Sequence, residues 1–295
     1  MNILVTGAKG QLGTEIRKCF ERGYTELGVP EVLKLDNYVR YIDIDELDIA
    51  DLGALRAVLG EGKFDAVINC AAYTNVNMAE SEGKDIAFKA NAIGPRNLAI
   101  ACEEIGAKLV HVSTDYVFAG DGDKPYVEYD ICDPQSVYGA TKHLGEEYVK
   151  QFSTKYFIVR TSWLYGYYGK NFVKTMMTIA RERGACKVVS DQRGNPTNAC
   201  DLAHHLLKLV TTEEYGIYHG TGNGECSWFE FTQKIVELAG IEATVSPCTS
   251  DEFPSPVKRP SYSALDNSMF RSTVGDEFRD WQDALKCFME NYKGE

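Results

Sequence analysis

The chain has 295 residues, of which 44% are hydrophobic and 25% charged, and it carries a formal net charge of −12. This composition is typical of a folded enzyme, built as one large domain or as a large domain with a smaller companion. The acidic balance and the lack of a long basic run argue against nucleic acid as a partner, because neutralising phosphates requires clustered Lys and Arg.

Cysteine usage and the amino terminus bear on localisation. The nine cysteines are scattered and form no C-x-x-C pair, and the first residues, "MNILVTGAKG", lack the basic and apolar regions of an export signal. No apolar run approaches the roughly eighteen residues of a membrane span. We therefore expect a cytoplasmic protein with reduced thiols and no membrane partner.

Strand and helix patterns alternate through the first half of the chain. Apolar runs bounded by polar turns predict strands, and periodic stretches between them predict helices. The predicted strands are 2–6, 40–45, 64–72, 107–114 and 156–162, and the predicted helices are 11–20, 51–61, 80–105 and 138–152. Such alternation is typical of βαβ units, so we predict an α/β fold with a Rossmann-type, doubly wound parallel sheet and helices on both faces.

The second half is less regular. Predicted strands at 186–190 and 216–220 are interleaved with helices at 171–183, 199–212 and 227–239, a proline-containing loop-rich stretch at 246–262 and two short closing helices. The change near residue 163 predicts a larger domain, 1–162, and a smaller C-terminal lobe, 163–295, interleaved with the sheet edge.

Three glycines follow the first predicted strand directly and open an amphipathic helix. They are Gly7, Gly10 and Gly13 of "GAKGQLG". At such a turn the backbone N–H groups and the helix dipole favour a pyrophosphate, and the glycines permit the tight turn, the approach of phosphate and close helix–strand packing. The position predicts a dinucleotide site.

Acidic residues near the end of the second strand bear on the choice of dinucleotide. Asp43, Asp45 and Asp48 follow "YI" in this region, and a carboxylate here holds the ribose hydroxyls of NAD and repels a 2′-phosphate. Lys9, inside the glycine turn, favours NADP instead. The choice between NADH and NADPH stays open.

Tyr138 and Lys142 lie four residues apart at the start of a predicted helix and therefore share one face. An adjacent ammonium favours the phenolate, and we expect Lys142 to lower the pKa of Tyr138 towards the working pH of a general acid. Upstream, the strand "LVHVS" ends at Thr114 and Asp115, at the sheet edge where open α/β folds bind ligands. A hydroxyl there suits a substrate carbonyl beside the tyrosine. The five histidines show no metal-ligand spacing, which argues against a metal hydrolase.

The motifs "GAKGQLG", "NCAAYTNV", "STDYVFAG", "VYGATKHLGE", "RTSWLYG", "NFVKTM" and "DQRGNPT" together resemble the extended short-chain dehydrogenase/reductases, and among them the dTDP-4-dehydrorhamnose reductase family. The resemblance covers nearly the whole chain in the right order. It implies NADPH- or NADH-dependent reduction of the C4 ketone of dTDP-4-dehydro-L-rhamnose to dTDP-L-rhamnose. Residues 1–162 would then bind the cofactor, and 163–295 mainly the sugar nucleotide.

The resemblance also implies roles for individual residues. Tyr138 would be the proton donor, Lys142 its partner and ribose ligand, and Thr114 would tune the hydrogen bond to the carbonyl. Asn91 would support the active site. The implied cofactor contacts are Gly7, Gly10, Gln11, Leu12, Gly13, Asp43, Asp48, Ile49, Ala71, Ala72, Tyr73, Tyr138 and Lys142, and the implied substrate contacts are Thr114, Asp115, Trp163 and Arg259.

Departures from the family pattern leave alternatives open. Where many relatives read "VDKAE", this chain has Asn77 and Met78 in place of the acid and the base, and its segment 24–40 is longer. A reductase or epimerase of another nucleotide sugar is therefore the first alternative. A non-catalytic subunit, like the regulatory subunit of methionine adenosyltransferase, is the second. The resemblance implies a homodimer and an interface Mg²⁺, for which Glu15 is a candidate ligand, but we predict no metal and expect Glu15 to be a solvated surface residue.

Overall fold

The structure, a computed structural model, describes residues 1–253 and 255–294. Its centre is a six-stranded sheet with the order β10-β5-β4-β3-β1-β2, in which every neighbouring pair is parallel. The strands are β1 (Asn2–Thr6), β2 (Tyr38–Ile42), β3 (Ala66–Asn69), β4 (Lys108–Thr114), β5 (Tyr156–Thr161) and β10 (Gly216–His219). From β1 the chain passes to β2 on one side of β1 and then returns to β3 on the other side. The predicted doubly wound sheet is therefore confirmed.

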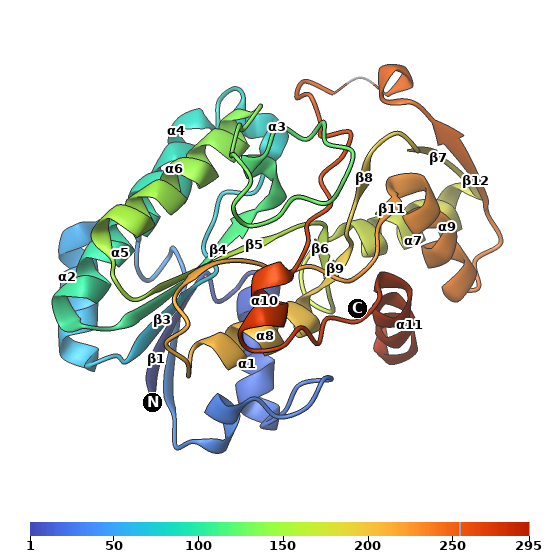
Figure 1. The fold of residues 1–295 in the computed structure, drawn as a ribbon. Helices are drawn as coiled ribbons and strands as arrows, with labels where there is room; N and C mark the ends of the chain where they lie inside the picture. Colours follow the sequence, from blue (N-terminus) through green and yellow to red (C-terminus); the bar gives the residue numbers. More distant parts are fainter. Residues whose placement is uncertain (254, 295) are drawn as a thin grey trace.

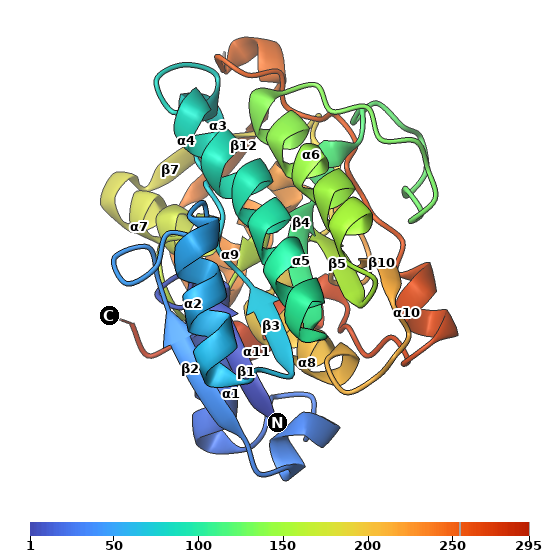
Figure 2. The same ribbon diagram turned by 90° about the vertical axis from the view of Figure 1, so that its left-hand side faces the viewer.

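Helices cover both faces of this sheet (Figures 1 and 2). On one face lie α2 (Leu52–Gly62), α5 (Gly94–Ile105) and α6 (Val137–Phe152), and on the other lie α1 (Gln11–Arg22) and α8 (Ala199–Leu209). Successive side chains of a strand point to opposite faces. In β1, Ile3 therefore packs into the core under α1 and α8, whereas Leu4 packs into the core under α2 and α5.

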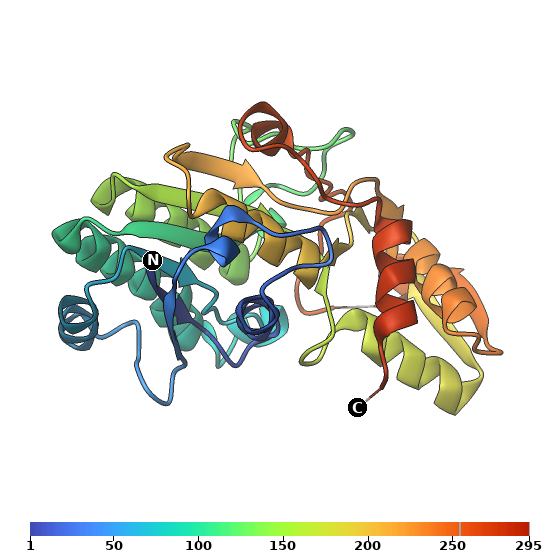
Figure 3. The same cartoon turned by 90° about the horizontal axis from the view of Figure 1, so that it is seen from below.

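The C-terminal half contributes to the sheet as well as to the smaller lobe. β10 pairs with β5 at the sheet edge, and α8 packs against α1. The lobe itself contains α7 (Phe172–Arg183), α9 (Trp228–Leu238) and α11 (Trp281–Asn291), which lie apart from the sheet around a third hydrophobic core (Figure 3). The division of the chain at residue 162 stays a prediction.

Short pairings complete the lobe. β7 (Ala185–Val189) pairs with β12 (Thr244–Cys248), β6 (Leu164–Tyr165) with β9 (Thr197–Asn198), and β8 (Arg193–Gly194) with β11 (Cys226–Ser227). β12 begins the stretch that we predicted to be a loop, and that part of the prediction is wrong: in a two-stranded sheet Pro247 sits at an edge, where its missing N–H is tolerated. Pro254 of the same stretch lies outside the described residues.

The helix predicted at 80–105 begins later, at Lys84, and contains a π-helical turn. It runs without a gap through α4 (Lys84–Phe88), the π-helical turn (Lys89–Ile93) and α5, and the short α3 (Val76–Ala79) precedes it. The π-helical turn carries Asn91, whose fully buried amide bonds both backbone groups of Tyr73. A π-helical turn inside a helix is frequent at functional sites. Through Asn91, the π-helical turn ties this helix to the segment that follows β3.

The longer segment 24–40 is docked on the sheet domain. Its Thr25 hydroxyl lies 2.7 Å from Nδ1 of His204 on α8, and Nε2 of His204 lies 2.6 Å from a Glu277 carboxylate oxygen. The segment includes a 3-10 turn, Glu31–Lys34, before β2. Near the other end of the chain, a short helix, α10 (Ser268–Ser272), precedes α11. Among the described residues, no helix has both the length and the apolar character that crossing a bilayer demands.

Candidate active site

The glycine turn between β1 and α1 lies at the point where the strand order reverses. Gly7 has φ of +64°, and a Cβ there would lie 2.6 Å from the backbone nitrogen of Ala71 at the end of β3. A Cβ on Gly13 would lie 2.4 Å from the carbonyl oxygen of Gly7. Only glycine fits at these two positions, and the turn therefore lets a ligand approach the backbone at the carboxyl edge of the sheet.

A cavity of about 680 Å³ opens beside this turn. Of the residues predicted to contact a cofactor, those in its lining are Gly7, Gly10, Asp43, Asp48, Ile49, Ala71, Ala72 and Tyr73. The other five predicted contacts lie outside the lining; they are Gln11, Leu12, Gly13, Tyr138 and Lys142. The side chain of Gln11 turns towards the smaller lobe, where it bonds Leu164 and Asn171, and that of Leu12 is buried in the core. The glycine cradle and the carboxylates fit a dinucleotide, with Asn91 holding Tyr73 in the wall.

The carboxylates of this cavity are already engaged. Asp43 accepts hydrogen bonds from the backbone N–H groups of Lys9 and Ile44, both at 2.8 Å. The Lys9 ammonium pairs with Asp45 at the exposed rim. One wall of the cavity thus holds the carboxylates of Asp43 and Asp48 and the exposed ammonium of Lys9.

Tyr138 and Lys142 lie in the first turns of α6, which begins with the Ser136 side chain as its N-cap. Lys142 is 2% exposed and its ammonium donates to the carbonyl oxygen of Val112 at 2.7 Å. Burial lowers the pKa of Lys142 to about 8, an effect that Glu146 opposes. The two side chains share a helix face, as predicted, but both are withdrawn from water.

The expected acidification of Tyr138 by Lys142 is wrong. Burial raises the pKa of Tyr138 well above its ordinary value, the hydrogen bond with Thr114 opposes this rise, and Asp115 and Tyr116 add to it. The phenol is 9% exposed, and removing water disfavours the phenolate more than any neighbour favours it. Tyr138 is therefore a neutral, proton-bearing group over the whole neutral range.

The Tyr138 ring packs in a cluster that includes two other tyrosines. It belongs to one cluster with Tyr73, which lines the dinucleotide cavity, and with Tyr116, whose ring meets it edge-on at 5.5 Å between centroids. Tyr116 lines a second cavity of about 620 Å³. Tyr138 itself lines neither cavity, but its cluster contributes Tyr73 to the lining of one and Tyr116 to the lining of the other.

The second cavity lies between the sheet domain and the smaller lobe. Phe172, Met176 and Trp228 form an apolar wall, and Arg183, Lys187 and Arg259 supply cations. Lys187 is paired with Glu252, whereas Arg259 bonds two neutral groups, the Tyr116 hydroxyl at 3.0 Å and the Asn77 amide oxygen at 2.7 Å. No carboxylate among the described residues pairs with Arg259. An aromatic wall with an uncompensated guanidinium suits an aromatic ring attached to an anion.

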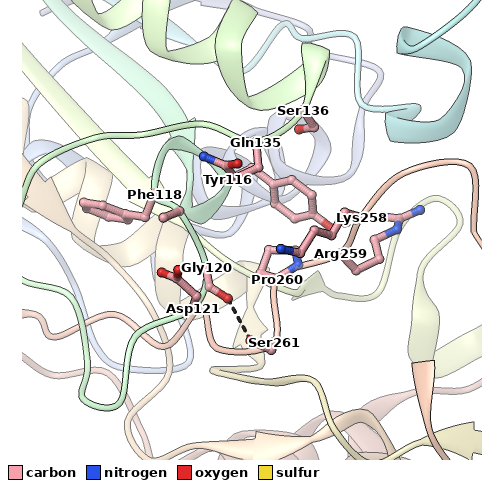
Figure 4. Close-up of a pocket in the computed structure, with 11 residues that line it drawn as sticks. Tyr116, Phe118, Gly120, Asp121, Gln135, Ser136, Lys258, Arg259, Pro260 and Ser261 are labelled. Atoms are coloured by element: carbon pink, nitrogen blue, oxygen red, sulfur yellow. Dashed lines mark hydrogen bonds between the residues drawn. The ribbon is translucent and has the colours of Figure 1, made fainter. Parts of the chain in front are cut away.

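The loop that carries Arg259 is packed against the loop after β4. The Ser261 hydroxyl donates to the Gly120 carbonyl at 3.1 Å, and Tyr116 points towards Arg259 and Lys258 around a cavity of about 30 Å³ (Figure 4). That volume holds about one water. The small cavity therefore belongs to the packing that positions Arg259.

Known proteins resemble the chain over almost its whole length. It matches the family described as RmlD substrate binding domain over residues 1–293. A dTDP-4-dehydrorhamnose reductase of Streptomyces griseus is 40% identical over 293 residues, 96% of this chain and 91% of the relative. The chain belongs to the dTDP-4-dehydrorhamnose reductase family.

Solved structures agree with this membership. The crystal structure of a dTDP-4-dehydrorhamnose reductase from Clostridium acetobutylicum is 46% identical, with a TM-score of 0.92 over 98% of this chain and 99% of that one. A dTDP-4-dehydrorhamnose reductase from Bacillus anthracis, solved in complex with NADP, is 40% identical, with a TM-score of 0.90 over 98% of both chains. The match to this reductase family thus extends from sequence to three-dimensional structure.

Trp163, a substrate contact implied by likeness to the reductase family, has an unusual backbone. Its φ is +46°, which is costly for a bulky residue, and its ring stacks on Trp228 at 3.5 Å between centroids. Trp228 lines the second cavity, with Trp163 behind it. The role predicted for Trp163 stays a prediction. Trp228 carried no signal that distinguished it in the sequence from an ordinary core aromatic residue, and Phe172 lies in the motif "NFVKTM" but was assigned no role.

The sequence analysis also did not predict a cluster of three potential metal ligands around α6. Potential ligand atoms of Cys132, His143 and Glu146 lie within 4.8 Å of one another. Arg160 occupies this cluster, however, because its guanidinium donates to Glu146 at 2.8 Å and to the Cys132 sulfur at 3.2 Å. A buried guanidinium among the ligands opposes a metal cation, so we assign the cluster as an ion-pair network.

Glu15 is not the solvated surface residue that we expected. It is fully buried on the side of α1 that faces α8, and it pairs with Arg22 at 2.7 Å. Burial raises the pKa of Glu15, and Arg22 opposes that rise. Glu15 is buried because α8, from the second half of the chain, covers this side of α1.

Proposed function

We propose that the chain reduces the C4 ketone of dTDP-4-dehydro-L-rhamnose to dTDP-L-rhamnose with NADPH or NADH, and that Tyr138 donates the proton. The observation that carries this proposal is the cluster that packs Tyr138 together with Tyr73, which lines the dinucleotide cavity, and with Tyr116, which lines the second cavity. The names of the similar reductases support the same substrate.

The residues suit a reduction at neutral pH. The bound nicotinamide cofactor would supply the hydride. Because burial raises the pKa of Tyr138, the phenol keeps its proton until negative charge develops on the substrate oxygen. Lys142, with a pKa of about 8, is mainly an ammonium at pH 7, and Val112 holds it in place. Thr114 and Asp115 would face the sugar beside the phenol.

The second cavity suits the nucleotide of the substrate. Phe172 and Trp228 offer flat apolar surfaces to a pyrimidine, and Arg259 offers N–H groups to a diphosphate without a competing carboxylate among the described residues. We propose on this basis that 163–295 mainly binds the sugar nucleotide and that 1–162 binds the cofactor.

Both reduced cofactors remain in the proposal. The carboxylates of Asp43 and Asp48 suit an unmodified ribose, while Lys9 is 61% exposed at its side chain and can leave Asp45 for a 2′-phosphate. A similar reductase binds NADP. We expect the ratio of kcat/KM for NADPH and NADH to lie within about tenfold of unity, a difference of about 1.4 kcal/mol.

The direct test is oxidation of NADPH and NADH by the purified chain in the presence of the dTDP-keto sugar. Tyr138→Phe should lower kcat by about a hundredfold to ten-thousandfold, the usual contribution of a general acid. Tyr148→Phe on the same helix is the matched control, because the Tyr148 ring packs on Phe152 far from Tyr116 and Tyr73. Full turnover by Tyr138→Phe would refute the proposal.

A reductase of another nucleotide sugar is the second candidate, and Asn77 beside Arg259 favours keeping it. Measuring the rate of NADPH oxidation with dTDP-, UDP- and GDP-linked keto sugars separates the two candidate functions.

A non-catalytic subunit is disfavoured by the packing of Tyr138, Lys142 and Thr114 around one site. Absence of turnover together with a stable heteromer would favour it.

Two further proposals concern the state of the protein in the cell. We propose a homodimer, which the family resemblance supports and which sedimentation of the purified chain would test. We also propose a cytoplasmic location, because all nine cysteines are free thiols. Fractionation of cells expressing the tagged chain checks the second proposal.

A further inference from the structure

The side chain of Gln11 joins the dinucleotide turn to the smaller lobe. Gln11 is the first residue of α1 and directly follows Gly10, which lines the dinucleotide cavity. The Gln11 amide nitrogen donates to the carbonyl oxygen of Leu164 at 3.2 Å, and the Gln11 amide oxygen accepts from the Asn171 amide at 3.0 Å. Leu164 begins β6 and Asn171 is the N-cap of α7. One side chain therefore holds both ends of the connection between β6 and α7.

Each of the two partners is one residue away from the aromatic wall of the second cavity. Asn171 precedes Phe172, which lines that cavity and whose ring lies 4.3 Å from the ring of Trp228 between centres. Leu164 follows Trp163, which stacks on Trp228 at 3.5 Å between centroids. The two hydrogen bonds therefore set the position of this wall relative to the glycine turn.

The backbone of Gln11 faces the site of the other ligand. The first N–H groups of an α-helix have no partner within the helix, and they attract a diphosphate. In α1 the N-cap is Gly10, so no side chain satisfies these groups. A diphosphate that accepts from them restricts the motion of the backbone from which the Gln11 side chain extends.

We propose that Gln11 couples the two cavities, so that a dinucleotide at the glycine turn strengthens the binding of the sugar nucleotide in the second cavity. The inference rests on the proposed function and deepens it by assigning a positioning residue. Gln11 carries the restraint to Leu164 and Asn171, and a wall that the first ligand has already ordered costs less entropy to order around the second. By linkage, the sugar nucleotide strengthens the binding of the dinucleotide by the same factor.

A second joint between the lobe and the sheet domain provides a comparison. The Tyr167 hydroxyl, from the same connection, donates to the Glu26 carboxylate beyond the other end of α1, and Glu26 also pairs with Arg279 at 2.8 Å. None of these three residues is in the lining of either cavity. This joint attaches the lobe without adjoining a ligand, so its loss should not uncouple the cavities.

The test is a binding cycle, measured by calorimetry with NADP and dTDP, each alone and in the presence of saturating amounts of the other. In the wild type, NADP should lower the Kd for dTDP by about fivefold or more, the lower end of typical coupling between sites. Gln11→Met keeps an unbranched side chain of similar length but neither hydrogen bond. In this variant the Kd for dTDP should be the same with and without NADP, while the Kd for NADP alone is little changed.

Two further variants define the contact. Asn171→Ser keeps an N-cap oxygen for the backbone N–H of Lys174, but its side chain is too short for Gln11 or for the Gly166 carbonyl. It should lose the coupling, and the double variant with Gln11→Met should lose no more, because both remove one contact. Tyr167→Phe is the matched control and should keep the wild-type ratio of Kd values. The same loss of coupling in Tyr167→Phe would show that Gln11 has no special part.

Hydrogen exchange gives an independent measurement. NADP should slow exchange of the backbone amides in 164–175 in the wild type and not in Gln11→Met. A merely structural role would lower the free energy of unfolding in Gln11→Met and leave the ratio of Kd values unchanged. That result, or equal Kd values for dTDP with and without NADP in the wild type, would overturn the inference.

The binding cycle needs no turnover, so it separates this inference from the proposed function. Coupling in a wild type that does not reduce the keto sugar would refute the reductase and leave the role of Gln11 intact. Turnover without coupling would refute the role of Gln11 alone. In an active enzyme, Gln11→Met should raise KM for the keto sugar at saturating NADPH by the coupling factor, with kcat little changed.

Discussion

Arg160 and Glu146 form an ion pair that is almost completely withdrawn from water. Their closest atoms are 2.8 Å apart, and their side chains are 2% and 0% exposed. The guanidinium also bonds the carbonyl oxygen of Glu128 and lies 5.0 Å from the centre of the Phe118 ring. The pair joins β5 to α6 one turn beyond Lys142, so it anchors the helix that carries Tyr138.

Glu146→Gln should strongly destabilise the protein. The change leaves the Arg160 charge buried without a carboxylate, for which we expect a loss of about 3–5 kcal/mol in the free energy of unfolding. Urea denaturation measures it. Glu21→Gln is the matched control, because Glu21 pairs with Lys18 on an exposed helix surface and should cost less than about 1 kcal/mol. Equal small losses in both variants would contradict the assignment.

The ion pair between Arg160 and Glu146 also predicts that the folded protein loses stability at acidic pH. Burial alone would raise the pKa of Glu146, but Arg160 and His143 outweigh it and hold that pKa well below its usual range. A carboxyl with a depressed pKa in the folded state stabilises the protein above its unfolded pKa of about 4.3, and this stabilisation is lost as the pH falls further. In Glu146→Gln the fall in stability below pH 4 should therefore be shallower.

His143 should be the one histidine that titrates above neutrality. The neighbouring Cys132 and the Glu146 carboxylate, 3.8 Å from the imidazole Nδ1, raise the pKa of His143 to about 9, whereas burial lowers the pKa of His205 and His219 to about 3. NMR titration of the imidazole protons measures all of them. The raised folded pKa stabilises the protein below about pH 6.5, and this contribution disappears as the pH rises through 9. A midpoint for His143 near 6.5 would show that the cluster with Arg160 is not formed.

Local patterns predicted much of this fold, and long-range packing accounts for what they missed. The strands, the glycine turn at Gly7 and the shared face of Tyr138 and Lys142 follow from periods of two and 3.6 residues and from turn chemistry. The pKa of Tyr138 does not, because burial depends on Tyr73 and Tyr116, which come from other elements. Spacing therefore predicted the pair but not its electrostatics.

The second cavity and α1 illustrate the same limit. Trp228 on α9 meets Phe172 on α7, at 4.3 Å between ring centres, only after the lobe has assembled. Glu15 is buried only because α8 returns from the second half of the chain to cover α1. Neither contact has a local signature in the sequence.

Asn77→Asp should weaken substrate binding. The Asn77 amide oxygen accepts from Arg259 at 2.7 Å, and a carboxylate there would pair with the guanidinium and compete with a diphosphate. We expect KM for the keto sugar to rise by about five- to tenfold, or about 1–1.4 kcal/mol, with kcat little changed.

Two further variants isolate the charge. Asn77→Ala removes the hydrogen bond without adding a charge and should change KM less than Asn77→Asp. The double variant Asn77→Asp/Met78→Lys adds a neighbouring base that competes for the new carboxylate, so KM should return towards the wild-type value. Equal effects of Ala and Asp at position 77 would mean that charge plays no part.

Gly13→Ala should weaken cofactor binding while leaving the chain folded. A Cβ at this position would lie 2.4 Å from the Gly7 oxygen and 2.7 Å from the Ala8 Cα, both backbone atoms, so the turn must open where a pyrophosphate would bind. We expect the Kd for NADPH, measured by calorimetry, to rise more than about tenfold, or about 1.4 kcal/mol. Gly60→Ala is the matched control, because a Cβ there has nothing within 4 Å on an exposed turn of α2. That variant should gain up to about 1 kcal/mol of stability and bind NADPH normally, whereas normal binding by Gly13→Ala would place the cofactor elsewhere.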